Sequence, residues 1–350
     1  MLPRLLLAEV RQNGRTKRLR FRKRKQTIPR RIVSINTRES GQTQFMENLN
    51  VVIALTTRQN DYQAEQAQSA TDVASRLGVT INVIYADGDA VNQSQQLVKI
   101  IQDRNQHPTA ILVEPIGTPM PQVAKAAVAA GIGWGILNRE ADYIPELRRS
   151  GHVPVFAVSP DQEEVGKIQG KQLAALTTEG NVLYIEGPTT SSAASLRSKG
   201  MLATKPRGVE LKMLKGDWSE ASAQHSVKSW LSLSTSRQLH IRAVVCQNDA
   251  MAMGARKAFA DLTEADRDQW LNTPFLGCDG VTKTGQEWVR AGHLRATVVI
   301  PPMAGLALEM LVNAISSGSM PPERTICAPR SFPPIAEISA QHGKSAKRGS

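Results

Sequence analysis

The sequence predicts an α/β protein with two similar lobes, each built on a parallel sheet. Its 350 residues exceed what one compact core usually holds. From about Asn50 onward, short β-branched runs alternate with amphipathic helical stretches, and the alternation repeats in a second block. No run approaches the roughly 18 apolar residues that a membrane span needs, so no membrane span is expected.

The first block predicts four strands separated by helices. The strands are expected at residues 50–55, 81–85, 110–113 and 132–137. The helices are expected at residues 61–77, about 92–105 and 122–130. Gly78 and Gly131 stand at helix-ending positions, and Asn92 or Ser94 is the expected cap of the second helix. Residues 141–154 are expected to form a solvated loop.

The second block repeats the pattern. Its strands are expected at residues 155–158, 182–185, 209–214, 243–246 and 275–277. Its helices are expected at residues 164–176, 193–202, 221–233, 250–259 and 283–291. Strands that alternate with helices favour parallel sheets wound by right-handed crossovers.

The net charge of +12 is concentrated at the N-terminus. Residues 1–31 hold 12 Lys or Arg and a single acid, Glu9, which leaves 31 bases and 30 acids in the rest of the chain. Such a block repels itself, and we expect a solvated, disordered tail that could touch nucleic acid or anionic lipid through charge alone. The block could also be an upstream stretch outside the natural reading frame, with Met46 as an alternative start.

Neither the N-terminus nor the cysteines indicate export by themselves. The run from Leu5 to Ala8 is shorter than the apolar region of a secretory signal, and the basic block follows it. Taken literally, this places the chain in the cytoplasm. Cys246, Cys278 and Cys327 are odd in number and far apart, which predicts buried small hydrophobes.

Hydrogen-bonding residues follow the predicted strands, where open α/β sheets bind their ligands. These strand-end residues are Asn60-Asp61-Tyr62, Glu114-Pro115, Asn138-Arg139, residues 187–192, Asp217-Trp218, Asn248-Asp249 and Asp279-Gly280. Planar Asn, Asp and Arg groups can each engage two neighbouring hydroxyls, and an aromatic face can cover the C–H face of a sugar ring. Loops favour Asn, Asp and Gly for local reasons, but seven such sites together favour binding.

Catalytic motifs are missing from the sequence. It holds no G-x-x-x-x-G-K-[ST] phosphate loop, no G-x-S-x-G elbow and no H-E-x-x-H metal helix. The six histidines are scattered, and Asp249 and Asp279 are better explained as hydroxyl acceptors than as an acid–base pair. The prediction is a protein that is not an enzyme and uses no cofactor and no metal.

From about residue 50 to 334, the chain resembles the type I periplasmic binding protein family, in particular its ribose-binding-protein-like sugar-binding group. Lac-repressor-type ligand domains share this fold. The matching motifs are V-V-I-A-L-T-T-R-Q-N-D-Y at 51–62, G-I-L-N-R-E at 135–140, V-V-C-Q-N-D-A-M-A-M-G-A at 244–255, F-L-G-C-D-G at 275–280 and A-G-H-L-R-A-T-V at 291–298. The Q-N-D-x-M-A-x-G-A element is the most specific of them.

The resemblance implies two Rossmann-like lobes joined by a three-segment hinge. The first lobe is expected at residues 47–157 plus about 301–322, and the second at 158–300 plus about 323–338. Residues 1–46 and 339–350 are expected to be disordered tails.

The resemblance also implies a set of ligand-binding residues. Position by position these are Asn60, Tyr62, Asn138, Arg139, Trp218, Asn248 and Asp279, with Ser195 and Arg197 as further candidates. Trp218 falls at an aromatic stacking position. Asn138 replaces the family's usual Asp, and Ser195 stands where ribose binders have an Arg, so the site is less charged than a pentose site.

The function that follows is that of a non-catalytic substrate-binding protein, a monomer that closes around a sugar or polyol for ABC-type transport. The expected partner is a transporter permease or a signalling protein, and the family resemblance implies the periplasm or cell envelope. Two alternatives stay open: a cytoplasmic or membrane-associated ligand sensor, and the ligand domain of a transcription regulator. Residues 1–47 show no convincing helix-turn-helix, so nucleic acid is expected only at the basic tail.

Overall fold

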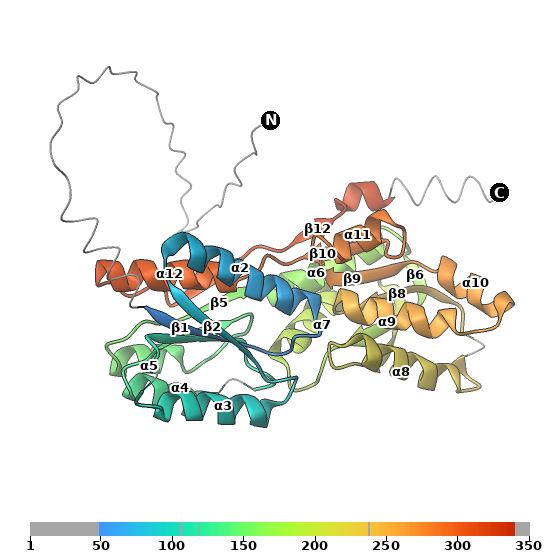
Figure 1. Ribbon diagram of the computed structural model, residues 1–350. Helices are drawn as coiled ribbons and strands as arrows, with labels where there is room; N and C mark the ends of the chain where they lie inside the picture. Colours follow the sequence, from blue (N-terminus) through green and yellow to red (C-terminus); the bar gives the residue numbers. More distant parts are fainter. Residues whose placement is uncertain (1–48, 106, 119, 237–238, 340–350) are drawn as a thin grey trace, which may run out of the picture. The chain divides into compact units, whose positions relative to one another are not determined.

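Runs of buried aliphatic side chains form the central strands of two separate six-stranded sheets (Figure 1). The computed structural model describes residues 49–105, 107–118, 120–236 and 239–339. Apart from Ser339, the predicted tails lie outside these residues. The two parallel-stranded sheets confirm the predicted fold class.

The first sheet is parallel throughout and has the order β11-β5-β4-β3-β1-β2. Its strands are β1 (Asn50–Leu55), β2 (Thr80–Tyr85), β3 (Ala110–Val113), β4 (Gly133–Leu137), β5 (Val155–Pro160) and β11 (Arg324–Cys327). The four strands β1, β3, β4 and β5 are almost entirely buried, as expected for a parallel sheet covered on both faces.

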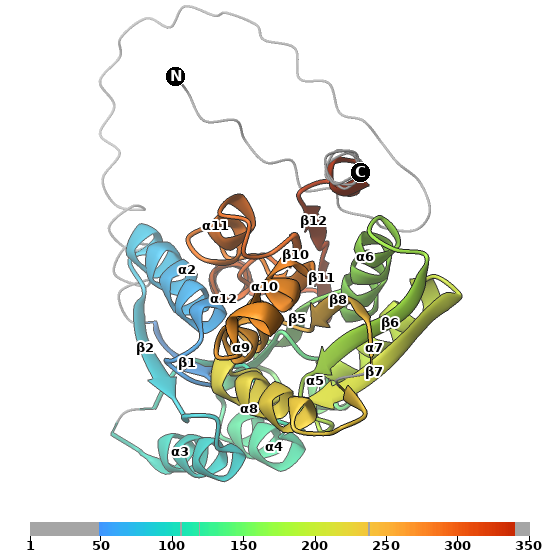
Figure 2. The same ribbon diagram turned by 90° about the vertical axis from the view of Figure 1, so that its right-hand side faces the viewer.

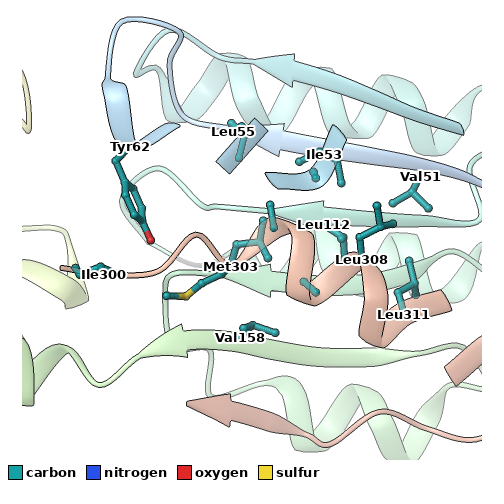
Figure 3. Packing of buried hydrophobic residues seen from close by; sticks show 14 of the residues in the cluster. Val51, Ile53, Leu55, Tyr62, Leu112, Val158, Ile300, Met303, Leu308 and Leu311 are labelled. Carbon is teal, nitrogen blue, oxygen red and sulfur yellow. The ribbon is translucent and has the colours of Figure 1, made fainter. Parts of the chain in front are cut away.

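Five helices cover the faces of the first sheet. α2 (Asp61–Leu77) and α12 (Ala304–Ser317) pack on one face, and α3 (Ala90–Gln102), α4 (Pro121–Ala129) and α5 (Ile144–Ser150) pack on the other (Figure 1). Figure 3 shows Leu308 and Leu311 of α12 facing Val51, Ile53 and Leu112 of the sheet. Each of these side chains is fully buried, so this core fixes the strands whose ends carry the site.

The second sheet has the order β12-β10-β9-β8-β6-β7, and only β12 runs antiparallel to its neighbour. Its strands are β6 (Glu179–Glu186), β7 (Gly208–Lys215), β8 (Ile241–Cys246), β9 (Phe275–Asp279), β10 (Ala296–Val299) and β12 (Arg330–Phe332). α6 (Gln162–Ala174) and α7 (Ser192–Thr204) pack side by side on one face. α8 (Glu220–Leu231) and α9 (Asp249–Ala260) pack on the other, with α10 (Glu264–Asn272) and α11 (Gly285–Arg290) (Figure 2).

The chain passes between the two sheets three times, which is the topology the resemblance implied. The first passage joins β5 to α6, the second joins β10 to α12, and the third joins β11 to β12. Two predicted boundaries are corrected. β5 continues to Pro160, past the expected end of the first lobe at 157, because it pairs with β11. The predicted second-lobe segment 323–338 therefore begins with a strand of the first sheet.

Two local predictions were also wrong. Asp89 caps α3 in place of Asn92 or Ser94: its side chain accepts from the backbone N–H groups of Val91 and Asn92. The expected loop 141–154 contains α5, whose Ile144 and Leu147 are buried in the core. α10, β10, α12, β11 and β12 were not anticipated.

Candidate ligand-binding site

The predicted binding residues lie at the carboxyl ends of strands of both sheets. Asn60 follows β1, Asn138 follows β4, Asn248 follows β8, and Asp279 ends β9. Trp218 lies in the connection from β7 to α8. Parallel strands deliver these connections to one edge of each sheet, which is why residues far apart in sequence can meet there.

Three of these residues have left-handed backbone conformations. The φ angle is 56° at Asn138, 77° at Trp218 and 103° at Asp279. Non-glycine residues seldom adopt positive φ, and for a bulky residue such as Trp it is a real outlier. Such strain persists only where the surroundings hold it in place, and it is concentrated at functional sites.

On the first lobe, a buried carboxylate organises the side chains. Glu114, directly after β3 and 1% exposed, accepts from Asn138 Nδ2 and from Gln63 Nε2 at 2.9 Å each. It also lies 3.4 Å from Arg139 Nη1, which donates to the Asn138 carbonyl at 2.8 Å. Arg139 Nε is buried and has no hydrogen-bond partner within the described ranges, which leaves one donor of this guanidinium unsatisfied.

On the second lobe, Arg197 takes the central place. Its guanidinium lies 5.4 Å from the centre of the Trp218 ring and 4.0 Å from Asp279 Oδ1. The Trp218 ring lies against the end of β6 because residue 187 is glycine: a Cβ there would be 2.3 Å from the ring. Asn248 Nδ2 holds the Trp218 carbonyl at 2.9 Å.

Contacts between the lobes bring the two halves together. Asn60 Nδ2 donates to the Trp218 carbonyl over 3.5 Å. The Tyr62 hydroxyl donates to the carbonyl of Pro301, in the second passage between the sheets, at 3.2 Å, and Figure 3 shows it pointing toward this segment. Burial raises the pKa of Tyr62 well above its usual value, with Glu114 next in effect, so this phenol is neutral.

Burial also shifts the pKa of the charged groups. It raises the pKa of Asp279 to about 7, against the opposing effect of Arg197. It lowers the pKa of Arg139, which Glu114 opposes. Asp249 has a pKa raised well above its usual value by burial and then by Asp279. Asp249 accepts from the Gly280 N–H and the Thr297 hydroxyl, so it fixes the loop after β9 and has a structural role.

Eight of the nine predicted residues lie in one connected cluster, and Ser195 does not. The eight are Asn60, Tyr62, Asn138, Arg139, Arg197, Trp218, Asn248 and Asp279. Ser195 is exposed and lines a surface hollow with Glu186, Ser198 and Lys215. On a helix, residues two apart point to different sides, so Arg197 and Ser195 cannot both face the cluster.

Sequence reasoning missed three residues that hold the cluster together: Glu114, Gln162 and Gln247. Glu114 was noted as a strand-end residue but not assigned to the site. Gln162 donates to Asn138 and accepts from Arg197. Gln247 accepts from the Gly187 N–H with its side chain and from Arg197 with its carbonyl. Glu114 and Gln247 stand directly after predicted strands, which was the available signal, whereas Gln162 lies two residues before the predicted helix 164–176.

The described residues include no gathering of three or more His, Cys, Asp or Glu side chains that could hold a metal ion. Within these same ranges, no helix is long and apolar enough to cross a bilayer.

Comparison with known proteins places this geometry in a family. A model described as periplasmic binding protein domain matches residues 51–319. The D-allose-binding periplasmic protein of Escherichia coli K12 is 26% identical over 279 residues, which are 77% of this chain and 86% of that protein. The xylitol-binding protein of Mycolicibacterium smegmatis is 30% identical over 233 residues, 64% of this chain and 60% of its own length.

Solved structures share the fold at low sequence identity. A galactofuranose binding protein superposes with a TM-score of 0.69 at 21% identity, covering 85% of this chain and 99% of its own. The myo-inositol binding protein of Caulobacter, bound to myo-inositol, superposes with a TM-score of 0.67 at 20% identity, covering 85% of this chain and 97% of its own.

Proposed function

Because the chain belongs to the periplasmic binding protein domain family, we propose that it is a non-catalytic binding protein that closes around a sugar or polyol for ABC-type import. The observation that carries this proposal is the buried cluster of donors and acceptors contributed by both lobes. A ligand that touches both lobes stabilises the closed arrangement by its differential affinity for it.

The chemistry of the cluster favours an uncharged, hydroxyl-rich ligand. Arg139 is paired with Glu114, and Arg197 faces Asp279, so the site balances its own charges at pH values above about 7, where Asp279 is ionised. Arg139 Nε remains free to donate to a hydroxyl. Trp218 supplies an aromatic face of the kind that covers the C–H face of a sugar ring. A ligand that lacks the matching hydroxyls would leave these buried groups unpaired, which gives specificity.

The names of similar proteins support an import role. They include D-allose-binding, xylitol-binding and D-apiose import binding proteins, and an ABC transporter periplasmic solute binding protein with bound D-allose. We infer from this support that the protein works in the cell envelope, with a transporter permease as its partner. The nine predicted residues, less Ser195, form the proposed binding site.

A thermal-shift panel tests the proposal. The panel holds D-allose, xylitol, D-xylose and myo-inositol, with a sugar acid as a charged comparison. A ligand at 100 times its Kd stabilises the folded state by about 2.7 kcal/mol, so a true ligand raises the melting temperature by several degrees. Failure of every neutral sugar and polyol to do so would contradict the proposal.

Trp218→Ala is the informative site variant. Trp218 is half-buried. Arg139, in contrast, is 6% exposed, and its removal would leave Glu114 buried without a cation. Arg139→Ala therefore tests stability as much as binding. Trp288→Ala is the control, because Trp288 is also half-buried in the second lobe but lies outside the site. Loss of the ligand response in Trp218→Ala alone is the expected result.

A further inference from the structure

A continuous chain of buried side chains runs from one lobe to the other through Gln162. Arg197 Nε donates to Gln162 Oε1 at 2.8 Å. Gln162 Nε2 donates to Asn138 Oδ1 at 3.0 Å and to the Asn138 carbonyl at 3.2 Å. Asn138 Nδ2 donates in turn to Glu114 Oε1 at 2.9 Å. All four side chains belong to residues that are at most 5% exposed, so each bond is made away from water.

The two ends of this chain fix its direction. A guanidinium can only donate hydrogen bonds, and a carboxylate can only accept them. The two amides between them must therefore point the same way, each donating toward Glu114 and accepting from the side of Arg197. If either amide turned over, a donor would face a donor or an acceptor an acceptor, in a buried place where such a mismatch is costly.

Gln162 occupies the point where the two lobes join. It is the first residue of α6, and it follows the first passage between the sheets. Both of its amide hydrogens are used on Asn138, and its oxygen is used on Arg197. The two residues that it bonds, Asn138 and Arg197, are both in the proposed binding site, whereas the amide of Gln162 makes its hydrogen bonds within the protein.

We propose that Gln162 is a positioning residue that links the two half-sites, holding Asn138 and Arg197 in the orientations that bind the ligand. This inference rests on the proposed function of the cluster. It predicts that ligand affinity depends on the direction of the amide at position 162, because a reversed or missing amide releases a residue in each lobe.

A polarity-swap cycle tests this. Gln162→Glu keeps the shape but places an acceptor against the Asn138 oxygens, and Glu114→Gln places an extra donor in the chain. Each single variant leaves at least one side-chain mismatch wherever the amides turn. In the double variant the Asn138 side chain can turn over, donating to Glu at 162 and accepting from Gln at 114, so the mismatches between side chains disappear and only the Asn138 carbonyl still faces an acceptor.

The expected result is strong non-additivity. Gln162→Glu weakens binding about tenfold or more, and the double variant recovers much of that loss. Recovery is partial, because Glu114→Gln also removes the partner of Arg139. Affinity is measured by calorimetry for whichever of D-allose, xylitol and myo-inositol raises the melting temperature of the parent. Additive losses in the double variant would overturn the proposal.

Gln172→Glu is the matched control. Gln172 lies on the same helix, is fully buried, and donates to the Thr297 carbonyl and the Ser331 hydroxyl, away from the site. It should lower the urea midpoint of unfolding as Gln162→Glu does but leave affinity within about twofold of the parent. An equal loss of affinity in the control would reduce Gln162 to a structural role and overturn the proposal.

The midpoint cycle keeps the inference separate from the proposed function. The urea midpoints of the two single variants and the double variant are measured without ligand. If no sugar or polyol of the panel raised the melting temperature, that result would count against the proposed function. The midpoints would still test the polarity of the hydrogen-bond chain. If Gln162→Glu does not fold, Gln162→Met replaces it, and a folded double variant then itself supports the proposal. An unfolded double variant beside a folded Gln162→Glu would contradict it.

Discussion

Single residues of this site combine strain with firm support. Trp218 has a φ of 77°, a conformation that costs about 1–3 kcal/mol for a non-glycine residue. Its carbonyl accepts from amides of Asn60 and Asn248, one on each lobe, and its ring lies beside Arg197. The neighbours therefore hold the aromatic face in one orientation before any ligand arrives.

The raised pKa of Asp279 predicts that stability and ligand affinity change in opposite directions with pH. Burial raises its pKa to about 7, while an unfolded aspartate has a pKa of about 3.9. Between these values the folded state holds a proton that the unfolded state has lost. The free energy of unfolding therefore falls as pH rises from about 4 to about 7, and Asp249, whose pKa is also raised, adds in the same direction.

Ligand affinity should rise over the upper part of this range, because a carboxylate accepts two hydroxyl hydrogen bonds more readily than a carboxyl group. At pH 6 only about a tenth of Asp279 is ionised, so affinity should be about tenfold below its value at high pH. Calorimetric titrations at pH 6, 7 and 8 measure this. Asp279→Asn should bind with little dependence on pH, and a parent protein with flat affinity would exclude the role given to Asp279.

At the residue scale, the sequence predicted which residues lie together better than it predicted the contacts between them. Asn60, Asn138, Asn248 and Asp279 could be predicted to lie together because parallel strands end at one edge of a sheet. Gln162 could not be found in this way, since its importance depends on Asn138 and Arg197, which are 24 and 35 residues away. The left-handed φ of Trp218 also carries no local sequence signal.

Helix starts connect the elements to the site. Asn60 caps α2 by accepting from the N–H groups of Tyr62 and Gln63, and the same side chain reaches the Trp218 carbonyl with its amide. One residue thus ends the loop after β1, begins a helix and touches the other lobe. Asn was predictable at a helix start, but its second contact was not.

Substitutions at Asn60 should separate these two roles. Asn60→Asp keeps an oxygen for the helix cap but loses the amide donor, so it should keep its stability and bind ligand about tenfold more weakly. Asn60→Ala loses both, and its unfolding free energy should fall by about 1 kcal/mol. Urea unfolding and calorimetry measure the two effects.

Asp89→Ala provides the comparison for Asn60, because it removes the cap of α3, where the Asp89 side chain accepts from the N–H groups of Val91 and Asn92, and because Asp89 is not one of the predicted binding residues. It should cost about as much stability as Asn60→Ala with unchanged affinity. Parent-like binding by Asn60→Asp would show that the amide of Asn60 does not matter.

The crossing of α6 and α7 depends on close backbone approach. A Cβ at Gly200 would lie 2.0 Å from the Glu163 carbonyl oxygen, so Gly200→Ala must push α7 away from α6. The expected cost is about 1–3 kcal/mol of unfolding free energy, with a loss of affinity because α7 carries Arg197. Gly318→Ala, at the left-handed end of α12 with open space around it, should lose stability but keep affinity. If both variants bound the ligand with the same affinity, the close crossing of α6 and α7 would have no part in holding the site.

At the scale of the molecule, the alternation of strands and helices predicted both sheets but not where the chain passes between them. The predicted break at 157 falls inside β5, because pairing with β11 extends that strand to Pro160. β11 itself is four residues long and half exposed, so it has no strong strand pattern. Pairing partners 167 residues apart cannot be read from local periodicity.

The excess positive charge of the chain can be removed without removing any strand or helix of the described residues. A variant that begins at Met46 loses all of the excess charge in residues 1–31, together with Arg38 and Glu39, which cancel each other. It keeps Leu49, whose carbonyl accepts from the Thr80 N–H, and the whole of β1. Its melting temperature and its sugar affinity should therefore match those of the full chain.

Polyanion binding should be the property that changes. The full chain carries a net charge of +12 and should be retained on heparin at low salt and released steeply as salt rises, because its binding comes from counterion release. The variant from Met46 should pass through, since the positive excess outside residues 1–31 is a single charge. Retention of both proteins to the same salt concentration would place a basic surface on the lobes themselves, and a lower melting temperature of the shorter chain would give the first 45 residues a part in folding.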